Sequence, residues 1–339
     1  MLYPAFFCLL ATTPVHLQRE PDLIVPTPPT YMLSLPRTSE IVISDASASA
    51  QGLLVITPTG SAARRLGDPN ALAGPTGLAM RDNHTGEILV GEQGRGRLAR
   101  LSNVSGAVLG HLDDGLVRAP LDIISSAGRL FVSDVCYSKV GSGEQAECIG
   151  RVVIYNARTL QHVRTIDSAV LPAGERFHPH GLATIPGAAG NGRLFVADAD
   201  SGCLWLFSFR GKLLQRIGTK GTDAMQFVPP RGLLLVAAAD QAADARRGGH
   251  FLVVAERKRV QMLHIPGAGG GDDASIRSVQ IIDFEEGSNL LGLCAVGERI
   301  FIADVGKSRL VVLRRRRNPL TTVEERENKR IELRHRQRQ

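Results

Sequence analysis

Six carboxylates end similar apolar segments, and they are the most regular chemistry-bearing residues in this sequence. The segments read IVISD, ILVGE, LFVSD, LFVAD, LVVAE and IFIAD, and their acids are Asp45, Glu92, Asp134, Asp198, Glu256 and Asp304. A carboxylate can move a proton or bind a metal, and it can also accept backbone N–H groups in a turn. Because the acid recurs in every unit, whereas a catalytic group has no reason to do so, we expect these acids to fasten turns toward the following strand.

Two histidines and a tyrosine could do chemistry of a different kind. His178 and His180 flank Pro179, and residues two apart on a strand point the same way. The pair could hold a metal if a third ligand joined it, or it could be structural. Tyr137 lies between Cys136 and a Gly/Ser-rich stretch that ends near Cys148. These two cysteines could pair in an oxidising compartment or stay free.

The acid-ending segments belong to larger units, whose acids lie 42 to 64 residues apart. A first segment such as PTGLAM or PHGLAT precedes each acid, and a third segment such as GRLARL or GCLWLF follows it. Several units also carry a weaker fourth segment. Four short strands in about 40 to 50 residues are typical of one β-propeller blade. The sequence therefore predicts an all-β chain that forms one six-bladed β-propeller, with four-stranded antiparallel blades around a central channel.

The repeated P-x-G-L, the strand-ending acid and the leucine-rich third strand resemble NHL repeats over residues 29–313. This resemblance implies one of two functions. Many NHL propellers are binding platforms for proteins or RNA. Others resemble enzymes, above all the peptidyl-hydroxyglycine amidating lyase and, more distantly, the gluconolactonases.

The fourth unit resembles the lyase blade in which a P-H-[GS]-L histidine binds the catalytic zinc, and His180 is the matching residue. In the third unit, DVCYSKV resembles the lyase motif D-G-Y-C, so Tyr137 matches its catalytic tyrosine with an offset of one residue. The lyase draws zinc histidines from three blades, but Thr76 and Leu291 occupy the other two positions here. Because this departure removes two ligands of the zinc site, the resemblance implies a retained scaffold more than a working lyase.

We therefore expect a binding scaffold for a protein or another macromolecule, with the partner on a loop face and no required cofactor. The alternative is a divergent metal-dependent enzyme, lyase-like or lactonase-like, that holds zinc or calcium in the channel. A gluconolactonase-like site needs acids and amides on the inner strands, where the sequence offers Asp122 and few others. Five scattered cysteines cannot supply the zinc ligands of a ubiquitin-ligase RING domain. We expect the chain to be a monomer.

The N-terminal segment, residues 1–28, has two candidate roles. Its apolar run from Leu2 to Ala11 is too short to span a membrane. It resembles a secretion signal but lacks the preceding basic residues, so secreted, nuclear and cytoplasmic locations all stay open. The segment Val15–Arg19 resembles the fourth strands of other units, and the sixth unit lacks one. We therefore predict that this segment completes the last blade and removes an exposed edge.

The C-terminal segment, residues 314–339, is predicted to be a basic tail, disordered or helical. It carries ten basic and four acidic residues, a net charge of +6 out of +7 for the whole chain. The sequence therefore indicates a nearly neutral propeller with a cationic extension. Such a tail could contact nucleic acid or an acidic partner.

Overall fold

The computed structural model describes most of the chain. The described residues are 15–45, 52–61, 63–68, 70–81, 86–135, 150–187, 191–237, 249–267 and 275–317. Within them, no helix is long and apolar enough to cross a membrane, and the helices are two three-residue 3₁₀ turns, η1 (Ser168–Val170) and η3 (Val305–Lys307).

Six four-stranded antiparallel sheets make up the fold, each ordered from an inner to an outer strand. The first two blades are β2 (Pro29–Ser34), β3 (Ile41–Asp45), β4 (Gly52–Ile56) and β5 (Ala63–Leu66), then β6 (Pro75–Met80), β7 (Glu87–Glu92), β8 (Arg97–Ser102) and β9 (Val108–Leu112). The third and fourth are β10 (Pro120–Ser126), β11 (Arg129–Asp134), β12 (Arg151–Asn156) and β13 (His162–Ile166), then β14 (Pro179–Ile185), β15 (Arg193–Asp198), β16 (Cys203–Ser208) and β17 (Leu213–Ile217). The fifth blade is β20 (Pro230–Ala237), β21 (His250–Glu256), β22 (Arg259–Ile265) and β23 (Arg277–Asp283), and the sixth is β24 (Leu290–Val296), β25 (Arg299–Asp304), β26 (Arg309–Arg317) and β1 (Val15–Ile24). A short parallel pair, β18 (Thr219–Lys220) and β19 (Gln226–Phe227), lies between the fourth and fifth blades.

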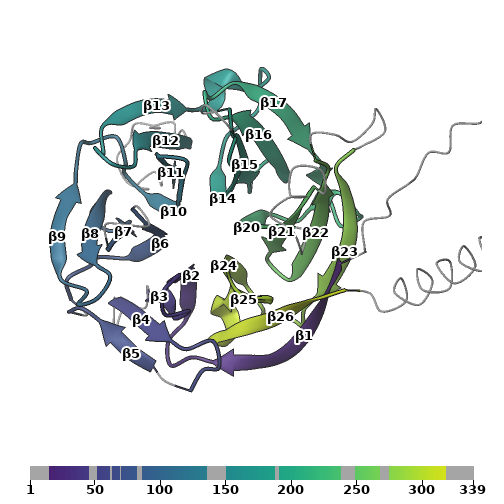
Figure 1. Ribbon diagram of the computed structural model, residues 1–339. Coiled ribbons are helices and arrows are strands. Elements are labelled where there is room, and N and C mark those ends of the chain that lie inside the picture. Colours follow the sequence, from purple (N-terminus) through teal and green to yellow (C-terminus); the bar gives the residue numbers. More distant parts are fainter. Residues whose placement is uncertain are drawn as a thin grey trace, which may run out of the picture.

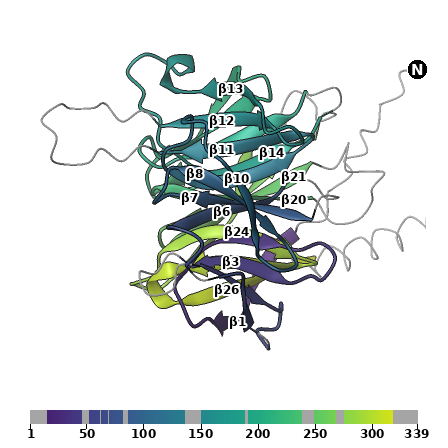
Figure 2. The same ribbon diagram turned by 90° about the vertical axis from the view of Figure 1, so that its left-hand side faces the viewer.

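The blades form a ring around a central channel lined by their first strands (Figure 1). Seen from the side, the strands run across the disc from one face to the other (Figure 2). The six-bladed propeller predicted from the repeats is confirmed, and four short strands per unit are what the structure contains.

The ring is closed by pairing the two ends of the described chain. β1 runs antiparallel to β26, with Val15 opposite Arg317 and Glu20 opposite Val312. Leu17 of β1 is buried in the core between the last two blades, and its backbone exchanges two hydrogen bonds with the Gln280 side chain of β23. β1 is therefore the outer strand of the sixth blade, which is the place that the sequence predicts for it.

One boundary differs from the sequence prediction. Residues 314–317, assigned above to a tail, are the last residues of β26 and pair with the start of β1. Long arginine side chains can keep their charged ends at the solvent while the backbone joins the sheet, as Arg316, which is exposed, does here. Residues 318–339 lie outside the described part of the chain.

The core lies between neighbouring blades. One buried cluster joins Phe195 and Leu204 of the fourth blade to Leu252 and Leu263 of the fifth. Each second strand packs against the neighbouring blades on both faces. All residues except the first are buried in β7, β11, β15, β21 and β25. This two-sided burial explains why these strands read as continuous apolar runs, not as alternating patterns.

The glycine of P-x-G-L is required where inner strands of adjacent blades meet. A Cβ atom at Gly232 would overlap the Leu291 carbonyl oxygen of the next blade, and one at Gly181 would overlap the Arg231 carbonyl oxygen. A glycine at this position therefore permits close approach of the two backbones.

Candidate functional site

The six recurrent acids lie at one end of the blades, where they tie each first strand to its own second strand. The side chains are essentially buried. In five blades they accept hydrogen bonds from backbone N–H groups just before the first strand: Ala73 to Glu92, Ala119 to Asp134, His178 to Asp198, Val228 to Glu256 and Asn289 to Asp304. The sequence prediction placed these bonds in the turn toward the third strand. Among the described residues, Asp198 makes that contact, through the N–H groups of Asp200 and Ser201.

Most of these acids also form an ion pair with an arginine of the third strand. The pairs include Arg97 with Glu92 at 2.7 Å, Arg151 with Asp134 at 2.8 Å and Arg309 with Asp304 at 2.9 Å. Arg259 pairs with Glu256 in the same way. In the fourth blade, the indole Nε1 of Trp205 replaces the arginine and donates to Asp198 at 2.8 Å. Each acid therefore has a charged or hydrogen-bonding partner inside its own blade, which is a structural arrangement.

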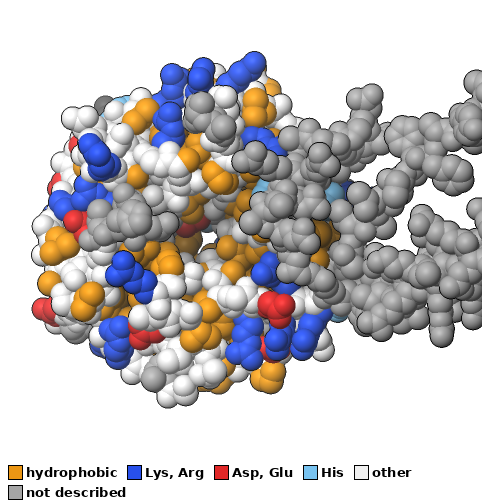
Figure 3. Space-filling view, viewed as in Figure 1, with side chains coloured by type: hydrophobic (Ala, Val, Ile, Leu, Met, Phe, Trp, Pro, Cys, Tyr) orange, Lys and Arg blue, Asp and Glu red, His pale blue; other side chains and the backbone are white. Residues whose placement is uncertain are grey.

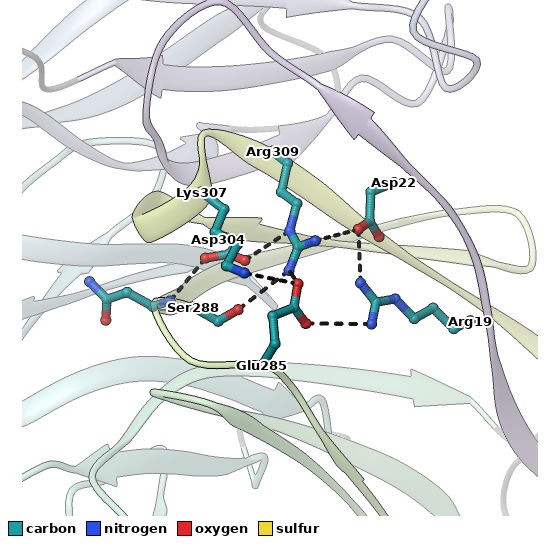
Figure 4. Close-up of polar contacts among 8 residues, drawn as sticks. Arg19, Asp22, Glu285, Ser288, Asp304, Lys307 and Arg309 are labelled. Atoms are coloured by element: carbon teal, nitrogen blue, oxygen red, sulfur yellow. Dashed lines mark hydrogen bonds and ion pairs between the residues drawn. The ribbon is translucent and has the colours of Figure 1, made fainter.

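In the sixth blade, this ion pair extends into a network that holds β1 in place. Arg309 contacts Asp304, Asp22 of β1 at 2.8 Å and Glu285 at 2.6 Å. Arg19 of β1 also contacts Asp22 (Figure 4). The acid of the last blade thus takes part in ring closure.

The histidine pair lies at the same end of the channel. The rings of His178 and His180 pack edge to face with centroids 4.9 Å apart, and His178 Nδ1 is 3.4 Å from Asp200 Oδ1. Burial, with smaller effects from His178 and Arg231, lowers the pKa of His180 to about 3, so its imidazole is neutral at physiological pH. A neutral imidazole can bind a metal, but it needs companions.

The residues present do not fit the three-histidine zinc site that the lyase resemblance implies. Within the described ranges, no group of three or more His, Cys, Asp or Glu side chains is arranged to hold a metal ion. The structure brings His178 and His180 together, and the part of the chain that it describes adds no third ligand of that kind. Tyr137, Cys136 and Cys148 lie outside the described residues. The two cysteines in the described part of the chain, Cys203 and Cys294, are free and buried.

The central channel forms a cavity of about 670 Å³. Its wall comes from the first strands of all six blades and combines aliphatic residues, with Met32, Leu78, Leu182, Leu233 and Leu293 among them, with polar groups in about equal measure. A volume of this size fits a small molecule. The cavity reaches from the middle of the first strands to the turns that follow them.

Asp122 lies in the wall of this cavity and takes the place of the P-x-G-L glycine in the third blade. Its Oδ1 accepts the N–H of Ile123 at 2.9 Å, and its Oδ2 accepts the N–H of Leu182 in the next blade at 2.8 Å. Burial raises the pKa of the Asp122 carboxyl to about 7, against the lowering effect of these two bonds. The residue as a whole is half-buried.

The cavity opens toward a face that we call the basic face, shown in Figure 3. We define it by the described turns from first to second and from third to fourth strands, with the two strand residues on each side. Its basic residues are Arg37, Arg64, Arg81, Arg129, Arg158, Arg193, Arg210, Lys212, Arg277, Arg299 and Arg316, and its acids are Glu40, Glu87 and Glu298. Basic side chains surround the channel mouth in Figure 3. The nearly zero net charge that the sequence indicates for the propeller is therefore the average of two ends that differ in charge.

Many cations on this face are not neutralised by neighbours. The three acids are already paired, Glu40 with Arg64, Glu87 with Arg81 and Glu298 with Arg314. The exposed side chains without an ion pair to any described residue come from five blades: Arg37, Arg158, Arg210, Lys212, Arg277 and Arg316. The face therefore carries a net positive field at its surface.

No protein-family model and no curated protein matches this sequence. Solved structures do match. A gluconolactonase from Xanthomonas campestris shares 16% identity over 88% of this chain and 98% of its own, with a TM-score of 0.56. A catalytically inactive virginiamycin B lyase from Staphylococcus aureus with quinupristin shares 14% identity over 89% of this chain and 99% of its own (TM-score 0.55). A chain of a nidogen/laminin complex shares 13% identity over 82% of this chain and 86% of its own (TM-score 0.56).

At these identities the likeness concerns the fold alone. The chain is a six-bladed β-propeller protein, and its structural neighbours include both enzymes and a protein from a protein–protein complex.

Sequence reasoning missed two features of this site. The first is the third-strand arginine that pairs with four of the six acids, although the signal was present: Arg97, Arg151, Arg259 and Arg309 open their third strands. The second is the basic face, because its residues come from turns that are far apart in the sequence. The sequence analysis identifies Asp122 as an acid on an inner strand, but it does not relate this residue to the P-x-G-L glycine whose position it occupies.

Proposed function

We propose that this chain is a binding propeller that presents its basic face to an acidic surface of a partner protein. The observation that carries the proposal is the set of six exposed cations without an ion pair to any described residue, spread over five blades around the channel mouth. Complementary charge steers diffusing partners and raises the association rate. The resemblance to NHL repeats supports this function, because that class includes protein-binding platforms.

A protein partner is favoured over a single-stranded nucleic acid. Every Phe, Tyr and Trp side chain in the described residues is buried. Proteins that bind single strands stack bases on exposed aromatic rings, which this part of the chain does not offer. One structural neighbour comes from a complex between two proteins, nidogen and laminin.

Charge reversal tests the proposal. The test variant changes Arg158, Arg210, Lys212 and Arg277 to Glu. The control variant makes the same change at exposed basic residues of the opposite end, namely Arg118, Arg176, Lys220 and Arg257. Both variants alter net charge equally, so they differ only in where the charge lies.

A fluorescently labelled Glu-rich peptide serves as the probe, with a nucleic acid of equal charge as the competitor. At roughly 0.2–1 kcal/mol per exposed pair, four lost contacts predict binding by the test variant that is about fourfold to about a thousandfold weaker. The control should bind like the wild type, and added salt should weaken all binding. Equal loss in the two variants would contradict the proposal, and tighter binding of the nucleic acid would assign the face to a different class of partner.

A further inference from the structure

The channel cavity combines three features that a binding site for a small molecule needs. It has a volume of about 670 Å³, a wall that is partly aliphatic and a small number of charged groups. The carboxyl and guanidinium groups among its described lining belong to Asp122, Arg81 and Arg158. The carboxyl lies part-way along the first strands, while both arginines follow strand ends nearer the mouth.

Asp122 has room for a further partner. Each of its oxygens accepts one backbone N–H, and a carboxylate offers about four acceptor positions in all. Apart from backbone, no described group donates to it. An ammonium group supplies both the missing donors and a compensating charge.

At the mouth, the two arginines are not equivalent. Arg81 is occupied, because it pairs with Glu87 at 2.8 Å and donates to the carbonyl oxygens of Ala157 and Arg158. The Arg158 side chain is exposed and forms no ion pair with a described residue. It is therefore free to contact an anionic group at the mouth.

We propose that this cavity binds a small zwitterionic molecule with an apolar body. Its ammonium group contacts Asp122, its aliphatic part lies against the leucine and methionine side chains of the wall, and its anionic group contacts Arg158. The chemical class is that of an ω-amino acid or a short apolar peptide. The inference stands independently of the protein partner proposed above.

A matched series of probes tests each contact by calorimetry. The probes are 8-aminooctanoate, n-octylamine and octanoate, which share chain length and differ only in their end groups. The wild type should bind 8-aminooctanoate at least about tenfold more tightly than either singly charged probe. Octanoate binding as tightly as 8-aminooctanoate would overturn the proposal, as would no binding of any probe.

Two variants assign the ends. Asp122→Asn should remove the advantage of 8-aminooctanoate over octanoate. Arg158→Gln should reduce 8-aminooctanoate to the affinity of n-octylamine while leaving n-octylamine binding unchanged. Arg158 is exposed, so this second variant keeps its fold even if Asp122→Asn does not. Arg257→Gln, at the opposite end, is the matched control. Unchanged affinity for 8-aminooctanoate in both test variants would exclude the site.

Discussion

Asp122 replaces a glycine that four other first strands carry at the same position, namely Gly77, Gly181, Gly232 and Gly292. At those positions the neighbouring backbone leaves no space for a Cβ atom. In the third blade, the carboxyl instead bridges to the Leu182 N–H of the next blade. Asp122 thus replaces a close contact between two backbones with a hydrogen bond between the third and fourth blades. It also places a carboxyl in the wall of the channel.

The raised pKa of Asp122 predicts a specific pH dependence of stability. Because the folded protein holds this proton more tightly than the unfolded chain, the stabilising contribution is fully present below the ordinary value of 3.8. It is lost as the pH rises through about 7. Urea unfolding between these limits should show stability falling with pH, and the slope should be smaller in Asp122→Asn. Parallel profiles for the two proteins would contradict the assignment.

The buried ion pairs predict a large effect from a single side chain. Arg309→Met should cost about 3–5 kcal/mol, because it leaves the buried Asp304 carboxylate without its cation. Lys258→Met is the control, since Lys258 pairs with the exposed Glu286, and it should cost no more than about 1 kcal/mol. Denaturant unfolding measures both changes, and similar losses would mean that the acid is not fastened as described.

At the scale of elements, β1 is the strand that turns an open array into a ring. It covers the outer edge of β26, buries Leu17 and connects to Arg309 through Asp22. An uncovered edge would expose a row of unpaired backbone groups. The sixth blade is therefore built from both ends of the described chain.

Removal of this strand should weaken the whole molecule. Deletion of residues 1–24 is expected to lower the melting temperature by roughly 10 °C or more, given that several kcal/mol of contacts are lost. Deletion of residues 1–14, which leaves β1 complete, is the control and should change it little. A synthetic peptide of residues 15–24 should restore part of the loss. A deletion that leaves the melting curve unchanged would show that β1 does not close the ring.

The elements differ in how well the sequence predicts them. The blades were predictable because a strand-ending acid marks the same place in every unit and P-x-G-L recurs in three of them. The end of β26 was not, because Arg314–Arg317 read as a solvated run and their pairing partner, Val15–Gln18, lies at the other end of the chain. The cavity wall was also hidden, since it combines residues of all six first strands and the turns near them, which are far apart in the sequence. The closing strand did leave a local signal, because Val15–Arg19 resembles the fourth strands of other units.

At the scale of the whole molecule, charge is sorted by face. Turns at one end of the disc carry Arg158, Arg210 and Arg277 beside few acids, whereas the six strand-ending acids lie at the other end. Because strands alternate in direction, neighbouring turns in the sequence belong to opposite faces. The net charge summed along the chain therefore hides the difference in charge between the two faces.

The central claim is that an acidic protein surface docks on the basic face, and hydrogen exchange measured by mass spectrometry tests it most directly. The experiment compares the wild-type protein with and without the Glu-rich peptide. We expect protection in turns of the basic face, at residues 35–40, 157–161 and 209–212. Protection confined to the opposite end, at residues 113–119 and 218–225, would contradict the claim.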